Sequence, residues 1–136
     1  MSKQLLKQIT DLNIEKTKDL LENFTTVELN NLDKDGNTIL HLAIKVFLEK
    51  EKNLSNMSKA DLISYTKTSA AIINMLVSKM SDWAMHSINN DGFTAMHYAF
   101  KSGNDNISWA ICGLKKHLYF DENCNILGNL EDNDYY

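Results

Sequence analysis

The sequence contains no proline and no arginine, and it has only five glycines and two cysteines. All 14 basic residues are therefore lysines, and the net charge is −4. Nucleic-acid-binding proteins favour basic patches and arginine forks, so this composition argues against nucleic acid as a partner. The two cysteines, Cys112 and Cys124, lack C-x-x-C spacing and a secretory context, which predicts reduced thiols and no catalytic role.

Several other patterns are missing from the chain. No apolar run is long enough to span a membrane, and the start, MSKQLLKQITDL, is amphipathic, unlike a signal peptide. Walker A, G-x-S-x-G, H-E-x-x-H and EF-hand patterns are absent from the sequence. We therefore expect no membrane insertion, no cofactor, no metal and no enzymatic activity. The expected location is the cytoplasm, or a host cytosol if the protein is a secreted effector.

The length and composition fit one folded domain. A chain of 136 residues buries about two-thirds of its unfolded surface. Its 43% hydrophobic and 24% charged residues are ordinary for a soluble protein, so a single domain over 1–136, monomeric when free, is expected. Abundant Asn, Lys and Ile without Pro or Arg are typical of AT-rich genomes, including those of intracellular bacteria, protists and some viruses.

An internal repeat is the strongest positive signal. Residues 31–45 read NLDKDGNTILHLAIK and residues 89–103 read NNDGFTAMHYAFKSG. Both contain D-G-x-T-x-x-H-x-A, at a constant offset of 56 residues (91 − 35). Asp-Gly predicts a turn with a positive φ at Gly, Thr predicts a helix N-cap, and the small Ala lets a neighbouring helix approach closely. Each unit is a turn plus a helix that must stack to bury its apolar face.

This motif resembles the start of an ankyrin repeat. The family's usual Pro after Thr is replaced by Ile39 and Ala95, which is tolerable at a helix start. The resemblance implies an all-α ankyrin-repeat solenoid of stacked helix pairs. The family period is about 33 residues, so the first full repeat carries an insertion of about 23 residues, which we place near Val46–Thr68.

The insertion itself has the properties of an ordered helical hairpin. It is rich in apolar residues, Ser58 and Asp61 form a helix-start signal, and no Gly or Pro occurs between Lys45 and Ser81. We expect its tip near Leu54 and Met57, with Leu48 and Ile63 packed across it. The expected organisation has four parts: an N-terminal cap at 1–30, a repeat at 31–88, a repeat at 89–120, and a degenerate C-terminal cap or tail at 121–136, with Cys124 where Gly would stand. The cap should contain helices Ser2–Asp11 and Ile14–Asn23, the latter capped by Asn13. The two repeats should contain helices Thr38–Lys52 and Lys59–Met80, and helices Thr94–Ser102 and Ile107–His117.

His41 and His97 occupy equivalent positions in the two motifs. A shared metal would need both side chains to turn toward each other across packed helices. We instead predict that they make structural hydrogen bonds to an adjacent loop, because the same polar residue recurs with the motif.

Protein–protein recognition is the predicted function. In the resembled family, variable turn residues and the exposed side of the first helix form a concave binding face. Phe93 is either a large aromatic contact for a partner or a side chain that folds back on its neighbour. An adaptor or effector binding a partner protein through this face is the first hypothesis; an inhibitor or immunity-type protein that blocks an enzyme with the hairpin is the alternative, and an enzyme is the third. The predicted contact residues are Lys34, Asp35, Asn37, Lys45, Asn90, Asp91, Phe93, Lys101 and Ser102, with Leu54 and Met57 at the hairpin tip.

Overall fold

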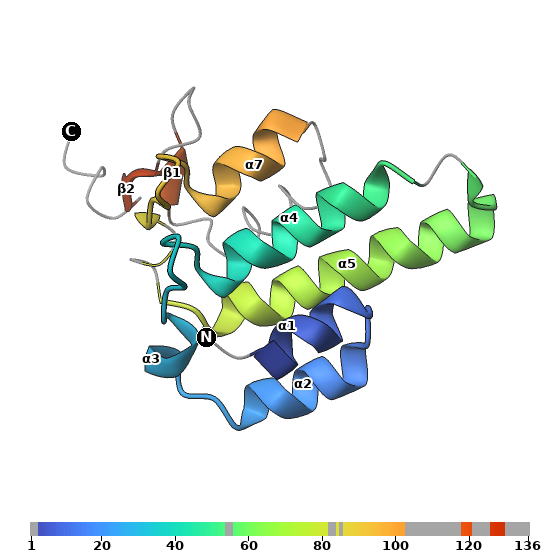
Figure 1. Cartoon of the computed structure of the whole chain (residues 1–136), viewed down its shortest axis with the longest axis horizontal. Helices are drawn as coiled ribbons and strands as arrows, with labels where there is room; N and C mark the ends of the chain where they lie inside the picture. Colours follow the sequence, from blue (N-terminus) through green and yellow to red (C-terminus); the bar gives the residue numbers. More distant parts are fainter. Residues whose placement is uncertain are drawn as a thin grey trace.

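Helices dominate the chain, which confirms the predicted all-α class (Figure 1). The computed structural model describes residues 3–53, 56–81, 84, 86–102, 118–120 and 126–129. The predicted helix at 107–117, the motif around Cys124 and the tip residue Leu54 lie outside these ranges. The elements are α1 (Lys3–Thr10), α2 (Ile14–Glu22), α3 (Thr26–Leu29), α4 (Ile39–Glu51), α5 (Lys59–Lys79), α7 (Ala95–Ser102), β1 (Leu118–Phe120) and β2 (Ile126–Asn129).

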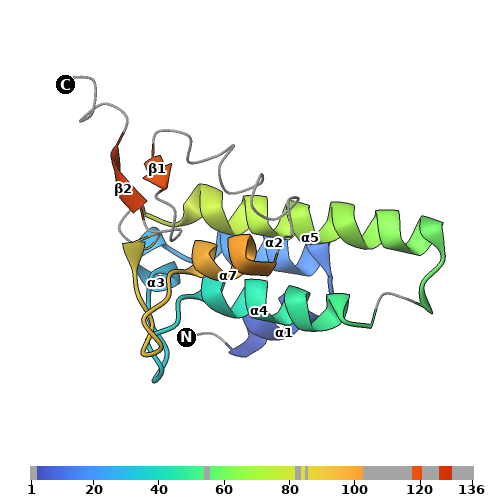
Figure 2. The same cartoon turned by 90° about the horizontal axis from the view of Figure 1, so that it is seen from above.

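The helices pack in two rows. α4 contacts α1 on one side and α7 on the other, so these three helices form the first row. α2 and α5 contact each other and form the second row, with α1 packed on α2 and α4 packed on α5 (Figures 1 and 2). No described helix is long and apolar enough to cross a membrane.

Side-chain caps fix where the helices begin. Asn13, Thr38 and Ser58 each accept a hydrogen bond from a backbone N–H three residues later, as the sequence predicted for α2, α4 and α5. α3 was not predicted. It begins at a capping box in which Thr25 and Glu28 bond each other's backbone N–H groups. The T-x-x-E spacing was therefore an available signal that the sequence analysis did not use.

Small residues let the helices of the first row approach closely. Ala43 on α4 and Ala99 on α7 are both fully buried, in agreement with the role predicted for the repeated alanine. Larger apolar side chains fill the space between the rows. Those buried completely on α4, α5 and α7 are Leu40, Ile44, Phe47, Ile72, Ile73, Leu76, Val77 and Met96.

α4 and α5 form the long helical hairpin that the insertion predicted, and it extends past the other helices (Figures 1 and 2). Tyr65 joins its two arms: the side chain is buried, and its hydroxyl donates a 2.8 Å hydrogen bond to the Phe47 carbonyl. Burial, aided by the charge of Glu51, raises the pKa of the Tyr65 hydroxyl. Ile63, which was predicted to pack against Leu48 across the hairpin, is 48% exposed.

The strand pair β1–β2 is an addition that the sequence did not predict. Leu118 pairs with Asn129 and Tyr119 with Gly128 in an antiparallel ladder, with an irregularity before Phe120. β2 falls inside the segment predicted to be a degenerate cap or tail, 121–136. The strand pair therefore spans the boundary that was predicted between the repeat at 89–120 and this segment.

Thr17 on α2 gives a stability prediction. Its side chain is fully buried, and Oγ1 has no hydrogen-bond partner among the described residues. A buried hydroxyl without a partner costs free energy, which an apolar side chain of similar shape does not. We expect Thr17→Val to raise the free energy of unfolding by about 1 kcal/mol in urea titration. Thr26→Val, at an exposed position, serves as the control, and a loss of stability in Thr17→Val would show that the hydroxyl has a partner.

Candidate functional site

The two Asp-Gly turns have the same internal geometry. In the first turn, Asp33 Oδ1 accepts from the backbone N–H groups of Asp35 at 2.9 Å and Asn37 at 2.8 Å. In the second turn, Asn89 Oδ1 accepts from the backbone N–H groups at the equivalent positions, Asp91 and Phe93, each at 3.1 Å. Gly36 and Gly92 have φ values of 78° and 83°, as predicted from the motif.

Asp33 is held in its charged form by these contacts. Burial by itself raises the pKa of the Asp33 carboxyl, but hydrogen bonds from Asn37 and Asp35 and the charge of Lys45 outweigh it. The net effect is a lowered pKa. Asn89, which is neutral, occupies the equivalent place in the second turn, so the turn requires an oxygen acceptor at this position and not a charge.

Hydrogen bonds also connect the two turns to each other. The Asn90 N–H donates to the Asp35 carbonyl at 2.8 Å. Asn89 Nδ2 donates to Asn37 Oδ1 at 2.9 Å and to the Tyr98 hydroxyl at 2.9 Å. The bonds of Asn90 to Asp35 and of Asn89 to Asn37 join residues more than 50 positions apart in the chain, and they set the position of α7 relative to α4.

His41, in the first turn of α4, makes the hydrogen bond to an adjacent loop that the sequence predicted. Its Nε2 lies 2.9 Å from the Phe93 carbonyl, which can only accept, so Nε2 carries the proton. Nδ1 accepts from the Thr38 N–H at 3.1 Å, and the His41 N–H donates back to Thr38 Oγ1 at 3.2 Å. The imidazole is fully buried and fixed as the neutral Nε2–H tautomer.

This environment gives stability a dependence on pH. Burial lowers the pKa of His41, and the charge of Lys45 lowers it too, against the hydrogen bond to Phe93 and the charge of Asp33. Because the folded pKa lies below the unfolded value of about 6.5, the unfolded state takes up a proton first as pH falls. The stabilisation is complete above about pH 6.5 and is lost as pH falls through the folded pKa.

We therefore expect the free energy of unfolding to fall more steeply below about pH 6.5 in the natural sequence than in His41→Ala. Urea titrations at several pH values measure both slopes. His86→Ala, which removes an exposed histidine, is the matched control. Equal slopes for His41→Ala and the natural sequence would contradict a neutral, buried His41.

Three aromatic rings gather at the second turn. Phe93 stacks on His97 with ring centroids 4.2 Å apart, and the Tyr98 ring meets Phe93 edge-on at 5.4 Å. Phe93 therefore folds back on its own helix, which was one of the two predicted alternatives, and it is half-buried. The His97 ring therefore packs on Phe93 of its own unit.

Two lysines cover these rings. Lys45 Nζ lies 4.9 Å from the centroid of Tyr98, and Lys101 Nζ lies 5.7 Å from the centroid of Phe93. Lys45 comes from α4 and Lys101 from α7, so the two ammonium groups belong to neighbouring helices of the first row.

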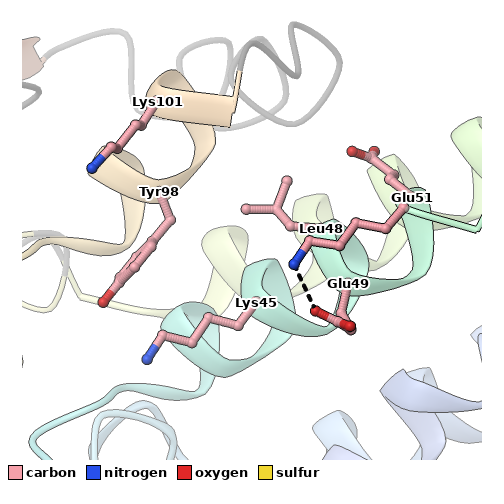
Figure 3. A pocket seen from close by; sticks show the side chains of 7 residues that line it. Lys45, Leu48, Glu49, Glu51, Tyr98 and Lys101 are labelled. Atoms are coloured by element: carbon pink, nitrogen blue, oxygen red, sulfur yellow. Dashed lines mark hydrogen bonds and ion pairs between the residues drawn. The ribbon is translucent and has the colours of Figure 1, made fainter.

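An open groove of about 810 Å³ lies between α4 and α7 beside these lysines (Figure 3). Among the described residues, Tyr98 and Lys101 line it from α7, and the others come from α4 and the residue after it. Leu48 lies between the two ends: Lys45 and Lys101 are at the Tyr98 end, while Glu51 is at the other. Burial raises the pKa of the Glu51 carboxyl. The residues from α4 and its C-cap are Lys45, Leu48, Glu49, Glu51 and Lys52.

The structure brings only some of the predicted contact residues to this groove. Lys45 and Lys101 line it. Met57 is 44% exposed at the far end of the hairpin, and Ser102 is the last residue of α7. The residues Lys34, Asp35, Asn90 and Asp91 are exposed on the two turns.

Asn37 is a correction to the predicted set. It is only 4% exposed, because its backbone and side chain are used by Asp33 and by Asn89 inside the turns. It therefore has no surface to offer a partner in this conformation. Its position in the motif was read as variable and exposed, but the cross-turn hydrogen bond requires it inside.

Tyr98 and Leu48 line the groove but were not among the predicted contact residues. Tyr98 stands three residues before Lys101, and Leu48 stands three residues after Lys45, so each shares a helix face with a predicted residue. That spacing was a usable signal. Comparisons with protein-family models, with curated proteins and with solved structures find no match for the chain.

Proposed function

We propose that the chain is a small ankyrin-repeat protein, an adaptor or effector whose task is to recognise another protein. The groove between α4 and α7 carries the proposal, because it is open and lies on the row of first helices. A partner seated there would touch Tyr98 and Leu48 in the groove and Lys34 or Asp91 on the turns. Large, partly exposed rings beside apolar surface are typical of contact sites.

Two observations support the assignment to ankyrin repeats. The turn–helix units share one hydrogen-bonding pattern at an offset of 56 residues, and His41 links one unit to the next. The helices also lie in a row of first helices and a row of second helices. In this assignment α1 and α2 form the N-terminal cap, and the long α4–α5 hairpin is an enlarged first repeat.

A second candidate function rests on the end of the hairpin. Met57, Leu62 and Ile63 are all exposed there, by 44%, 39% and 48%. Exposed apolar side chains on an ordered projection form a candidate contact surface. A protein that inserts this projection into the active site of an enzyme would act as an inhibitor or immunity-type protein.

One capture experiment separates the two candidates. The tagged full chain is incubated with native cytosol, next to a groove variant, Glu49→Trp, and a hairpin variant, Met57→Asp with Ile63→Asp. Glu49 is highly exposed, so the indole blocks the groove without entering the core. Asn74→Trp, at an exposed position on α5, is the matched control.

We expect the natural sequence, the control and the hairpin variant to capture the same protein, and Glu49→Trp to lose it. Loss in the hairpin variant alone, together with inhibition of a captured enzyme by the natural chain, would support the inhibitor instead. If all the variants captured the same proteins as the natural chain, both candidates would be overturned.

A further inference from the structure

The charged groups of the groove are not all neutralised. Glu49 and Lys52 pair with each other at 3.1 Å, with both side chains largely exposed. Lys45 and Lys101 have no carboxylate within ion-pair distance in the part of the chain that the structure describes. They lie instead over the rings of Tyr98 and Phe93. One end of the groove therefore presents two cations that form no ion pair with a described acidic side chain, although the charge of Asp33 interacts with Lys45 at longer range.

This cationic end is a local departure from the rest of the chain. The net charge is −4, so the molecule as a whole repels acidic surfaces. Within the groove, Glu51 stands at the end opposite Lys45 and Lys101 (Figure 3). A bound segment therefore meets positive charge at one end and negative charge at the other, which restricts favourable acidic contacts to the Tyr98 end.

The lining between the ends is apolar. Leu48 is half-buried and packs against the core, leaving part of its side chain to the groove. Tyr98 is held by the hydrogen bond from Asn89 and by the Phe93 ring, so its orientation is fixed before a partner binds. A preorganised aromatic beside an aliphatic side chain suits an apolar residue of a partner.

Resting on the proposed function, we infer that the groove binds an acidic segment of the partner protein, with carboxylates at Lys45 and Lys101 and an apolar residue on Leu48 beside Tyr98. The two lysines are complementary in charge to carboxylates. A lining that combines charged and apolar side chains fits a peptide, which can present both kinds of group. A nucleic acid would require a basic surface along its backbone, whereas this groove ends at Glu51. Four of the lining residues, from Leu48 onward on α4, belong to the insertion, so the insertion enlarges the recognition face.

The test uses random twelve-residue peptides displayed on phage and selected on the intact chain. The enriched peptides are synthesised, together with analogues in which every Glu and Asp is replaced by Gln and Asn. Their affinities are measured for the natural chain and for Lys45→Met with Lys101→Met. The methionines keep the aliphatic packing and remove the charge. Lys16→Met with Lys67→Met, at exposed positions of α2 and α5, is the matched control.

We expect acidic peptides with an adjacent apolar residue to enrich. We expect Kd to rise by about tenfold in Lys45→Met with Lys101→Met, and to stay unchanged in the control. The amide analogues should bind the natural chain about tenfold more weakly, and the affinity should fall as salt is raised. The melting temperatures of both lysine variants should match that of the natural chain. A weaker affinity would then reflect lost contacts with the peptide and not a loss of folded protein.

Enrichment of basic or purely apolar peptides, insensitivity to Lys45 and Lys101, or failure to enrich any peptide would overturn the inference. These results would leave the proposed function standing if Glu49→Trp still abolishes capture of a protein from cytosol. The proposed function itself would fail if Glu49→Trp captured the partner as well as the natural chain does.

Discussion

Gly36→Val is expected to lower the free energy of unfolding by about 4 kcal/mol, about twice the loss expected for Gly92→Val. Both glycines have a positive φ, which strains a β-branched residue. Only Gly36 is also crowded: a Cβ there would lie 3.2 Å from the Asn89 Cα and 3.3 Å from the Asn90 backbone nitrogen. At Gly92 a Cβ would meet no atom of the described residues within 4 Å.

The two substitutions are matched, because the residue type and the turn geometry are the same. Urea titration gives both losses, and their difference isolates the contact between the two turns from the strain within each turn. Equal losses would mean that the second turn does not pack on the first at Gly36.

His41→Ala is expected to lower the free energy of unfolding by about 3 kcal/mol. The substitution leaves the Phe93 carbonyl and the Thr38 N–H without the partners that His41 supplies, and it opens a cavity at a fully buried site. His86→Ala, at an exposed position, should change stability by less than about 0.5 kcal/mol. A loss below about 1 kcal/mol in His41→Ala would show that the link between the turns contributes little.

Local sequence signals predicted much of the fold. The Asp-Gly dipeptides determined positive φ at Gly36 and Gly92, and Thr38 and Ser58 began the helices that they were expected to cap. The absence of Gly and Pro between Lys45 and Ser81 indicated long, continuous helices, and α4 and α5 have that length. Each of these features depends on residues within four positions of one another, which is why a single sequence is enough.

The long-range contacts were not predictable in the same way. Asn89 donates to Asn37, which lies 52 positions away in the chain, so this contact depends on how the two turns come together. No local pattern distinguishes a buried Asn in a turn from an exposed one, so Asn37 was misassigned. The hydrogen bond that joins the hairpin arms was missed for a similar reason, because it depends on where the Tyr65 hydroxyl meets the Phe47 carbonyl, 18 positions away.

The candidate site shows the same division. Lys45 and Lys101 followed from the motif, whereas the groove between them follows from α4 continuing beyond α7, with Leu48 and Glu51 as its outer lining. Helix lengths were predicted separately for each unit. Their difference, which opens the groove, becomes apparent only when the two helices are placed side by side (Figure 3).

Site-specific photo-crosslinking shows directly whether a partner protein sits in the groove between α4 and α7. A photoreactive amino acid is placed in turn at Glu49 in the groove, at Met57 on the hairpin and at Asn74 on α5, all exposed positions. Each chain is illuminated with the partner captured from native cytosol. We expect a covalent adduct with the partner from position 49 and none from position 74. An adduct from position 57 or 74 with none from position 49 would contradict recognition through the groove.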